Sequence, residues 1–224
     1  MQIDKIKTIA ASLTLVGAAA LLYFSLGEKP AQVEPGPPMA LGQIMAEEAA
    51  KLTSAGGRLI LITLDNSMSR NPTAELQMKG FFTGLRDANL TAALTNAIRL
   101  DPLRLVRVPP AGFFEILKKQ SENDVIVSFL GPPVLTPEQR AKIADKKLRI
   151  LALCSGAMPR QIDLKELFAQ SLLHVAIISR SGQSPTPASP AATPRDSFDR
   201  LFQVVTSANL SELPPPANNM ARSQ

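Results

Sequence analysis

Apolar runs of strand length alternate with segments of helical periodicity along most of this chain, and that alternation is the strongest constraint on its fold. Residues 58–64 form a nearly continuous apolar run, which is typical of a strand covered by helices on both faces. Asn71 and Pro72 then predict a helix start, because asparagine caps helices and proline fits their first turn. Strand and helix in repeated alternation, joined by right-handed crossovers, predict a parallel sheet with helices on both sides.

The same alternation continues as far as residue 206. Thr136 and Gln139 predict a capping box, with Pro137 at the first helical position. Residues 92–100 are expected to form an extra helix that delays the second strand. The remaining expected elements are strands at residues 103–108, 124–130, 148–154 and 174–180, and helices at residues 112–120, 136–146 and 163–173.

Residues 201–206 fit either a sixth strand or the end of a helix that begins near Pro194, and the β-branched Val204 and Val205 favour the strand. Gly80 and Gly84 share one helix face, which predicts a close approach of that helix to the sheet. The expected fold class is therefore α/β: a three-layer, Rossmann-like and mostly parallel sheet in the flavodoxin-like order 2-1-3-4-5.

Residues 8–27 carry no charge and predict one N-terminal transmembrane helix before this domain. At about 1.5 Å per residue the run reaches about 30 Å, the thickness of one bilayer core. Lys5 and Lys7 favour a cytoplasmic location for residues 1–7. The expected topology is a single-pass protein of the cytoplasmic (inner) membrane, with an extracytoplasmic C-terminal domain and residues 8–27 as its contact with the membrane.

A cleaved signal peptide is the alternative for the same segment. Its apolar region normally spans about 7 to 15 residues, fewer than here. Residues 24–30 also contain no clean pair of small residues ahead of a cleavage point. These two observations favour an uncleaved anchor.

Beyond residue 27 the composition divides the chain into three further parts. Residues 28–38 hold four prolines and predict a semi-rigid stalk. Residues 39–213 are long enough for a single α/β domain, which contains a low-complexity loop at residues 181–194. The polar, proline-rich tail at residues 214–224 is expected to be disordered.

The composition argues against nucleic acid as a partner. The net charge is only +5, the basic residues are scattered, and aromatic residues make up 4% of the chain. Binding of single strands requires exposed aromatic side chains interleaved with basic ones.

No constellation of residues predicts an enzyme. Cys154 and His174 are the single cysteine and the single histidine, but they fall at opposite ends of two expected strands, roughly 20 Å apart. A zinc site requires several clustered ligands, and no glycine-rich phosphate motif follows a strand. Neither a metal nor a cofactor is expected.

Residues 59–85 combine a strand, Asp65 and Asn66, the pair Asn71 and Pro72, and a helix that carries Gly80. This segment resembles the first strand and helix of type I periplasmic binding proteins, the substrate-binding components of transporters. The resemblance implies one Rossmann-like lobe. It also implies a pocket after the first strand, and the candidate ligand-binding residues are Asp65, Asn66, Ser67, Asn71, Thr136 and Ser155.

Family members close two lobes over a ligand, whereas this chain has strands for one. A complete cleft would therefore require a homodimer or another subunit. Two functions remain open: a membrane-anchored binding or sensory lobe for a small molecule, and a non-catalytic scaffold component of a cell-envelope transport or secretion assembly. In either case a ligand or partner is expected between the first and third strands, at residues 65–71 and 131–135.

Overall fold

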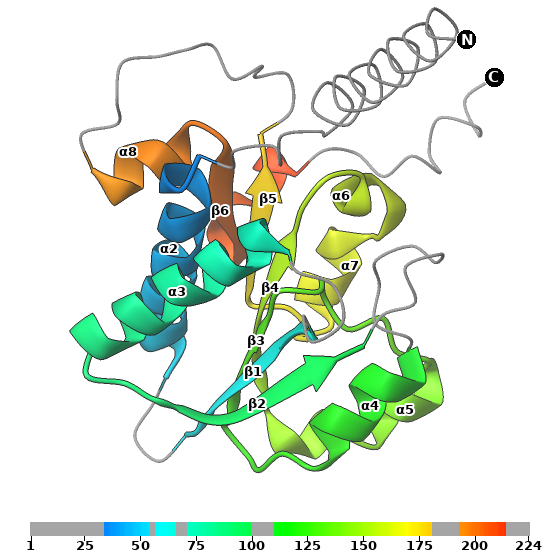
Figure 1. Ribbon diagram of the computed structural model, residues 1–224. Helices are drawn as coiled ribbons and strands as arrows, with labels where there is room; N and C mark the ends of the chain where they lie inside the picture. The colour runs from blue at the N-terminus through cyan, green and yellow to red at the C-terminus, as the bar shows by residue number, and fades with distance from the viewer. Residues whose placement is uncertain (1–33, 54–56, 66–70, 100–109, 181–192, 214–224) are drawn as a thin grey trace, which may run out of the picture. The chain divides into compact units, whose positions relative to one another are not determined.

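The computed structural model describes residues 34–53, 57–65, 71–99, 110–180 and 193–213 (Figure 1). The predicted cytoplasmic segment, membrane span, tail and most of the stalk lie outside these residues, so those predictions stand as they are. Within the described ranges, no helix is both long enough and apolar enough to cross a membrane.

One mostly parallel sheet of six strands organises the domain. Its spatial order is β2-β1-β3-β4-β5-β6. The first five strands run parallel, and β6 pairs antiparallel with β5. This confirms the mostly parallel sheet and the sixth strand. The order also matches the predicted 2-1-3-4-5, although the second strand is a different segment from the one expected at residues 103–108. The strands are β1 (Leu59–Leu64), β2 (Ala92–Ile98), β3 (Val125–Ser128), β4 (Arg149–Cys154), β5 (Val175–Ser179) and β6 (Phe202–Thr206).

The helix expected at residues 92–100 is wrong, because Ala92–Ile98 forms strand β2. Alanine and leucine favour helices, but pairing along the whole of β1, from Ala92 beside Leu59 to Ile98 beside Leu64, overrides that preference. As an edge strand, β2 exposes most of its side chains, so it lacks the apolar run that marks the inner strands. The strand expected at residues 103–108 lies outside the described residues.

Helices cover both faces of the sheet, with α2, α3 and α8 on one face and α4, α5 and α7 on the other (Figure 1). The predicted caps are present: side-chain oxygens of Asn71, Thr136 and Asp163 accept hydrogen bonds from Ala74, Gln139 and Glu166 amides. The helices are α2 (Gly36–Leu52), α3 (Pro72–Asp87), α4 (Pro110–Lys118), α5 (Pro137–Ala141), α6 (Met158–Gln161), α7 (Leu164–Ala169) and α8 (Pro194–Asp199), with 3₁₀ turns η1 (Ala144–Lys146) and η2 (Ser207–Glu212).

Helix α2 corrects the end of the predicted stalk. Gly36, Pro37 and Pro38 form its first turn, and Pro38 is buried, so these residues are helical and not extended. Proline is accommodated there because the first amides of a helix have no intrahelical partner.

Three glycines let α2 and α3 pack at very short range, and this corrects the role expected for Gly80 and Gly84. A methyl group on Gly80 would lie 2.0 Å from the Met39 carbonyl oxygen of α2, and one on Gly42 would lie 2.0 Å from the Gln77 oxygen of α3. Gly84 likewise faces Ala46 of α2. The glycines therefore serve helix–helix packing, not the approach of α3 to the sheet.

The alternation of side chains along the strands separates two apolar clusters. Leu61 and Val127 point to the face that α2, α3 and α8 cover, and they pack with Phe81 and Phe198. Ile62, Ile126 and Cys154 point to the other face and pack with Phe113 and Leu117. Both faces of β3 are fully buried, as expected for a central parallel strand.

Candidate functional site

The connections that follow β1 and β3 run over opposite faces of the sheet. After β1 the chain enters α3, whose Phe81 packs in one apolar cluster. After β3 it passes through Leu135 and Ile143, which belong to the cluster on the opposite face. In open parallel sheets this divergence leaves a crevice at the carboxyl ends of the strands. The structure therefore has the expected topological switch point between β1 and β3.

Asp65 and Ser155 both lie at this carboxyl edge. Ile62 of β1, Ser128 of β3 and Ala152 of β4 lie level with one another in the sheet. Asp65 and Ser155 each follow that level by three residues, on strands separated by one other strand. At about 4.8 Å between neighbouring strands, their backbones are about 10 Å apart across the sheet.

Asp65 is held in place from two sides. Its amide donates to the Ile98 carbonyl oxygen at 2.9 Å, and its carboxylate lies 3.5 Å from the Arg99 guanidinium. The Asp65 side chain is partly exposed. Arg99 was not among the sequence candidates. Residues 92–100 were expected to form a helix, and a helix there would not place Arg99 beside Asp65.

The segment after β3 forms a rigid rim of the same edge. Buried Ser128 accepts a hydrogen bond from the Leu130 amide at 3.2 Å, which tightens the turn. Gly131 has φ of 96°, a left-handed conformation that only glycine adopts without strain. A methyl group there would also lie 2.6 Å from the Met158 sulfur. Backbone and neighbours together fix this turn.

The other candidates divide into three groups. Asn71 is exposed and caps α3, with Oδ1 accepting from the Ala74 amide at 3.1 Å. Asn66 and Ser67 lie outside the described residues. Thr136 is not brought to the carboxyl edge, since the adjacent Pro137 lines a cavity together with Arg149 and His174, at the start of β4 and just before β5.

Cys154 and His174 lie at opposite ends of neighbouring strands, as predicted. The register pairs Cys154 with Ile178, four residues beyond His174, so about 13 Å along the strands separates them, less than the roughly 20 Å expected. Burial raises the pKa of the Cys154 thiol well above its usual range. A thiol that stays protonated and lies far from the imidazole is a poor nucleophile.

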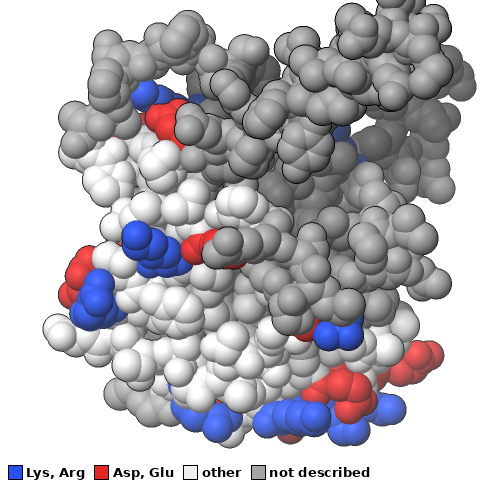
Figure 2. All heavy atoms as spheres, viewed as in Figure 1, with Lys and Arg blue, Asp and Glu red and all other residues white. Residues whose placement is uncertain are grey.

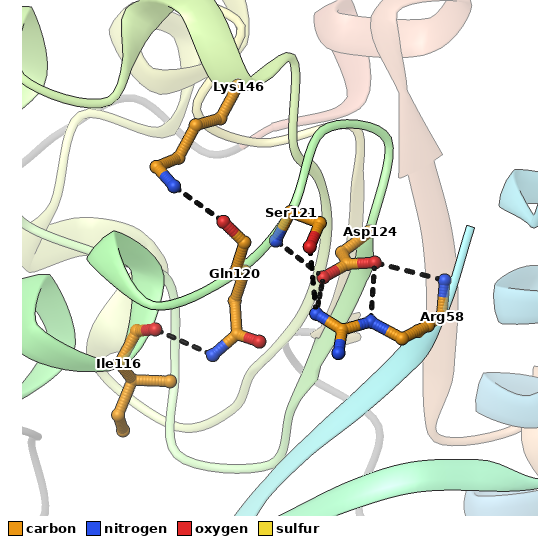
Figure 3. Close-up of polar contacts among 6 residues, drawn as sticks. All are labelled: Arg58, Ile116, Gln120, Ser121, Asp124 and Lys146. Atoms are coloured by element: carbon orange, nitrogen blue, oxygen red, sulfur yellow. Dashed lines mark hydrogen bonds and ion pairs between the residues drawn. The ribbon is translucent and has the colours of Figure 1, made fainter. Parts of the chain in front are cut away.

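An ion pair joins β1 to β3 at the amino edge (Figure 3). Two nitrogens of Arg58 donate to the Asp124 carboxylate at 3.2 and 2.7 Å, and the Arg58 and Ser121 amides donate to it as well. Burial raises the pKa of Asp124, but these hydrogen bonds and the charge of Arg58 outweigh it, so the pKa lies below the ordinary 3.8. The same side of the sheet includes a hydrogen bond from Lys146 Nζ to the Gln120 carbonyl oxygen. Asp124 therefore has a structural role.

Among the described residues, no three His, Cys, Asp or Glu side chains gather in a way that could hold a metal ion. Charged side chains of both signs lie close together along the lower rim in Figure 2, so that view presents no patch of one sign.

No family model and no curated protein matches the sequence. Among solved structures, AraP, an arabinose-binding protein from Geobacillus stearothermophilus, aligns with a TM-score of 0.50 and 12% identity, over 79% of this chain and 63% of that one. The domain resembles a solute-binding protein in fold. An ABC transporter solute-binding protein from Burkholderia graminis C4D1M, in complex with D-arabinose, aligns with a TM-score of 0.49 and 16% identity, over 78% of this chain and 61% of that one. This chain thus spans less than two thirds of the length of either structure, and the resemblance to a binding-protein lobe is confirmed.

Proposed function

We propose that the domain is a binding or sensory lobe for a small polar molecule, tethered by residues 8–27 to the outer face of the cytoplasmic membrane, and that it is not an enzyme. The observation that carries the proposal is the change of helix face between β1 and β3. Ligands of open α/β sheets bind at the carboxyl edge where such a divergence occurs, and Asp65 and Ser155 lie at this edge.

The chemistry of this edge suits a ligand rich in hydroxyl groups. The Asp65 carboxylate accepts hydrogen bonds, while the Ser155 hydroxyl both donates and accepts. Gly131 and Ser128 hold the rim in one conformation, so little ordering is required when a ligand binds. Arabinose, the ligand named for AraP, is therefore the first compound to test.

A single lobe leaves the crevice open on one side. This chain spans 63% of AraP. We propose that a second copy of the described domain, or a partner subunit, closes the crevice. A homodimer that closes over the ligand would give binding with a dependence on protein concentration.

The test is isothermal titration calorimetry of the full chain in phosphatidylcholine nanodiscs, with L-arabinose, D-arabinose and D-glucose. We expect at least one sugar to bind, and Asp65→Asn and Ser155→Ala each to weaken binding about tenfold or more, as removal of a hydrogen bond to a buried ligand does. Thr136→Ala is the matched control, because it loses a helix cap away from the crevice. Absence of heat with every sugar, from protein that still unfolds cooperatively, would reject the sugar-binding lobe.

A second candidate function is a non-catalytic scaffold component of an envelope transport or secretion assembly. Phe82 and Leu94 favour it, since each is 47% exposed at or beside the edge strand β2. Phe82 also lines a hollow of about 610 Å³ with Ala92 and Thr95 of β2. If the domain is a scaffold, Phe82→Ser should abolish co-purification of a membrane partner. If it is a binding lobe, the same substitution should leave sugar binding unchanged and should not cost a partner at this surface.

A further inference from the structure

Four described residues other than glycine have a left-handed backbone: Asn89, Asn123, Lys147 and Ser171, with φ of 54°, 65°, 48° and 55°. Each lies in the turn that leads from a helix or 3₁₀ turn into the next strand or its approach. Glycine is the usual residue at such positions, because a side chain crowds the following carbonyl oxygen. Asparagine tolerates the conformation, but lysine and serine do so at a steric cost.

Three of these residues surround one cavity. Asn123, Lys147 and Ser171 line a hollow of about 810 Å³ at the amino ends of β3, β4 and β5, on the opposite edge from the proposed sugar site. Its volume falls in the range of cavities that hold small organic molecules. Glycine would adopt these backbone conformations with less strain. The other residues found there indicate that their side chains are needed at this cavity.

The described lining of this cavity is basic. Arg140, Lys147 and Arg149 contribute to it, and no Asp or Glu does. Carboxylates outside the lining offset part of the charge, since Glu166 lies 4.0 Å from Arg140 and Glu122 lies 3.3 Å from Lys147. Arg149 donates from Nη1 to the Leu52 carbonyl oxygen of α2 at 2.6 Å, so its guanidinium is directed towards the helix on the other face of the sheet.

His174 adds a neutral donor. Its Nδ1 accepts a hydrogen bond from the Ile150 amide at 3.3 Å, so the proton of the neutral ring is on Nε2. Desolvation and the nearby charge of Arg149 lower the pKa of His174, which favours the neutral ring at neutral pH. Apolar side chains complete the lining: Ile143, Leu148, Ile150 and Leu172.

We propose that this amino-edge cavity is a second binding site, for a small organic anion that carries a phosphate or carboxylate group on an apolar body. Arg140 and Lys147 receive the anionic group, which suits charge-assisted hydrogen bonds. Leu148, Ile150 and Leu172 contact the apolar body. The proposal is independent of the sugar site, because the two sites share no residue.

The test compares matched substitutions at two left-handed positions. Lys147→Gly relieves the backbone at the cavity but removes a cation, so thermal stability is expected to rise while affinity for the anion falls about tenfold or more. Asn89→Gly is the control, because Asn89 has the same backbone conformation but lines the separate hollow between α3 and β2. It should leave affinity unchanged.

Binding is measured by calorimetry on the full chain in phosphatidylcholine nanodiscs, with phenyl phosphate and benzoate as probes and benzyl alcohol as the neutral control. We expect one or both anions to bind, benzyl alcohol not to bind, and affinity to fall as salt rises. Arg140→Gln provides a second variant in case Lys147→Gly unfolds. Absence of binding by both anions, or wild-type affinity in both Lys147→Gly and Arg140→Gln, would overturn the proposal, whereas loss of sugar binding in Asp65→Asn has no bearing on it.

Discussion

At the scale of single residues, His174 makes the stability of the domain depend on pH. Its pKa is lowered from 6.5 in the folded state, by desolvation first and by the charge of Arg149 second. The unfolded chain therefore binds the proton more readily, so the free energy of unfolding falls as pH decreases below about 6.5 and the contribution is complete above it. Protonation also removes the acceptor that the Ile150 amide uses.

His174→Asn separates this effect from the titration of carboxylates. Asparagine retains an acceptor near the Nδ1 position but does not ionise. We expect urea unfolding at pH 5, 6, 7 and 8 to give wild-type and variant curves that converge as pH decreases, because only the wild type loses stability through this group. Curves that stay parallel over this interval would mean that His174 does not titrate differently on folding.

Also at this scale, the sequence candidates fared unevenly. Asp65 and Ser155 could be assigned to the carboxyl edge because each follows an apolar run, and runs of that kind mark inner strands. The cavity lined by Lys147 and Ser171 could not be foreseen. A left-handed backbone is predictable from glycine but not from lysine or serine, whose conformation is imposed by the neighbouring helix and strand.

At the scale of elements, the contact between α2 and α3 is the most sensitive to substitution. Gly42→Ala would place its methyl group 2.0 Å from the Gln77 carbonyl oxygen, a distance that the backbones can relieve only by moving apart. We expect the free energy of unfolding to fall by about 1 to 3 kcal/mol, the usual cost of overpacking. Chemical denaturation measures it, and Gly156→Ala gives the comparison: a methyl group there meets nothing within 4 Å, but φ is 62°, so that variant reports the cost of a left-handed alanine without overpacking.

Elements were predictable where their determinants are local. Asn71, Thr136 and Asp163 announce helix starts because the cap and its partner amide lie within three residues. Strand β2 was missed because its conformation depends on pairing with β1, which is distant in sequence. The glycines of α3 were assigned to the sheet because α2 was not expected beside it.

At the scale of the whole molecule, the charge-free residues 8–27 predict a membrane anchor, and these residues lie outside the described part of the chain. The full-length protein should remain with membranes after extraction with alkaline carbonate, because residues 8–27 are uncharged and long enough to span the bilayer core. The domain should be cut by protease added to spheroplasts. A shortened protein in the soluble fraction would instead indicate a cleaved signal peptide.

The close packing of α2 on α3 has a mechanical consequence. Helix α3 begins eight residues after β1 ends, next to the carboxyl edge, and the first turn of α2 takes up the last prolines of the predicted stalk. Backbone atoms meet at Gly42 and Gly80 with no flexible side chains between them to absorb displacement. A displacement of α3 by a docked partner is therefore expected to carry α2 with it, and so to shift the end of the domain that follows the predicted tether.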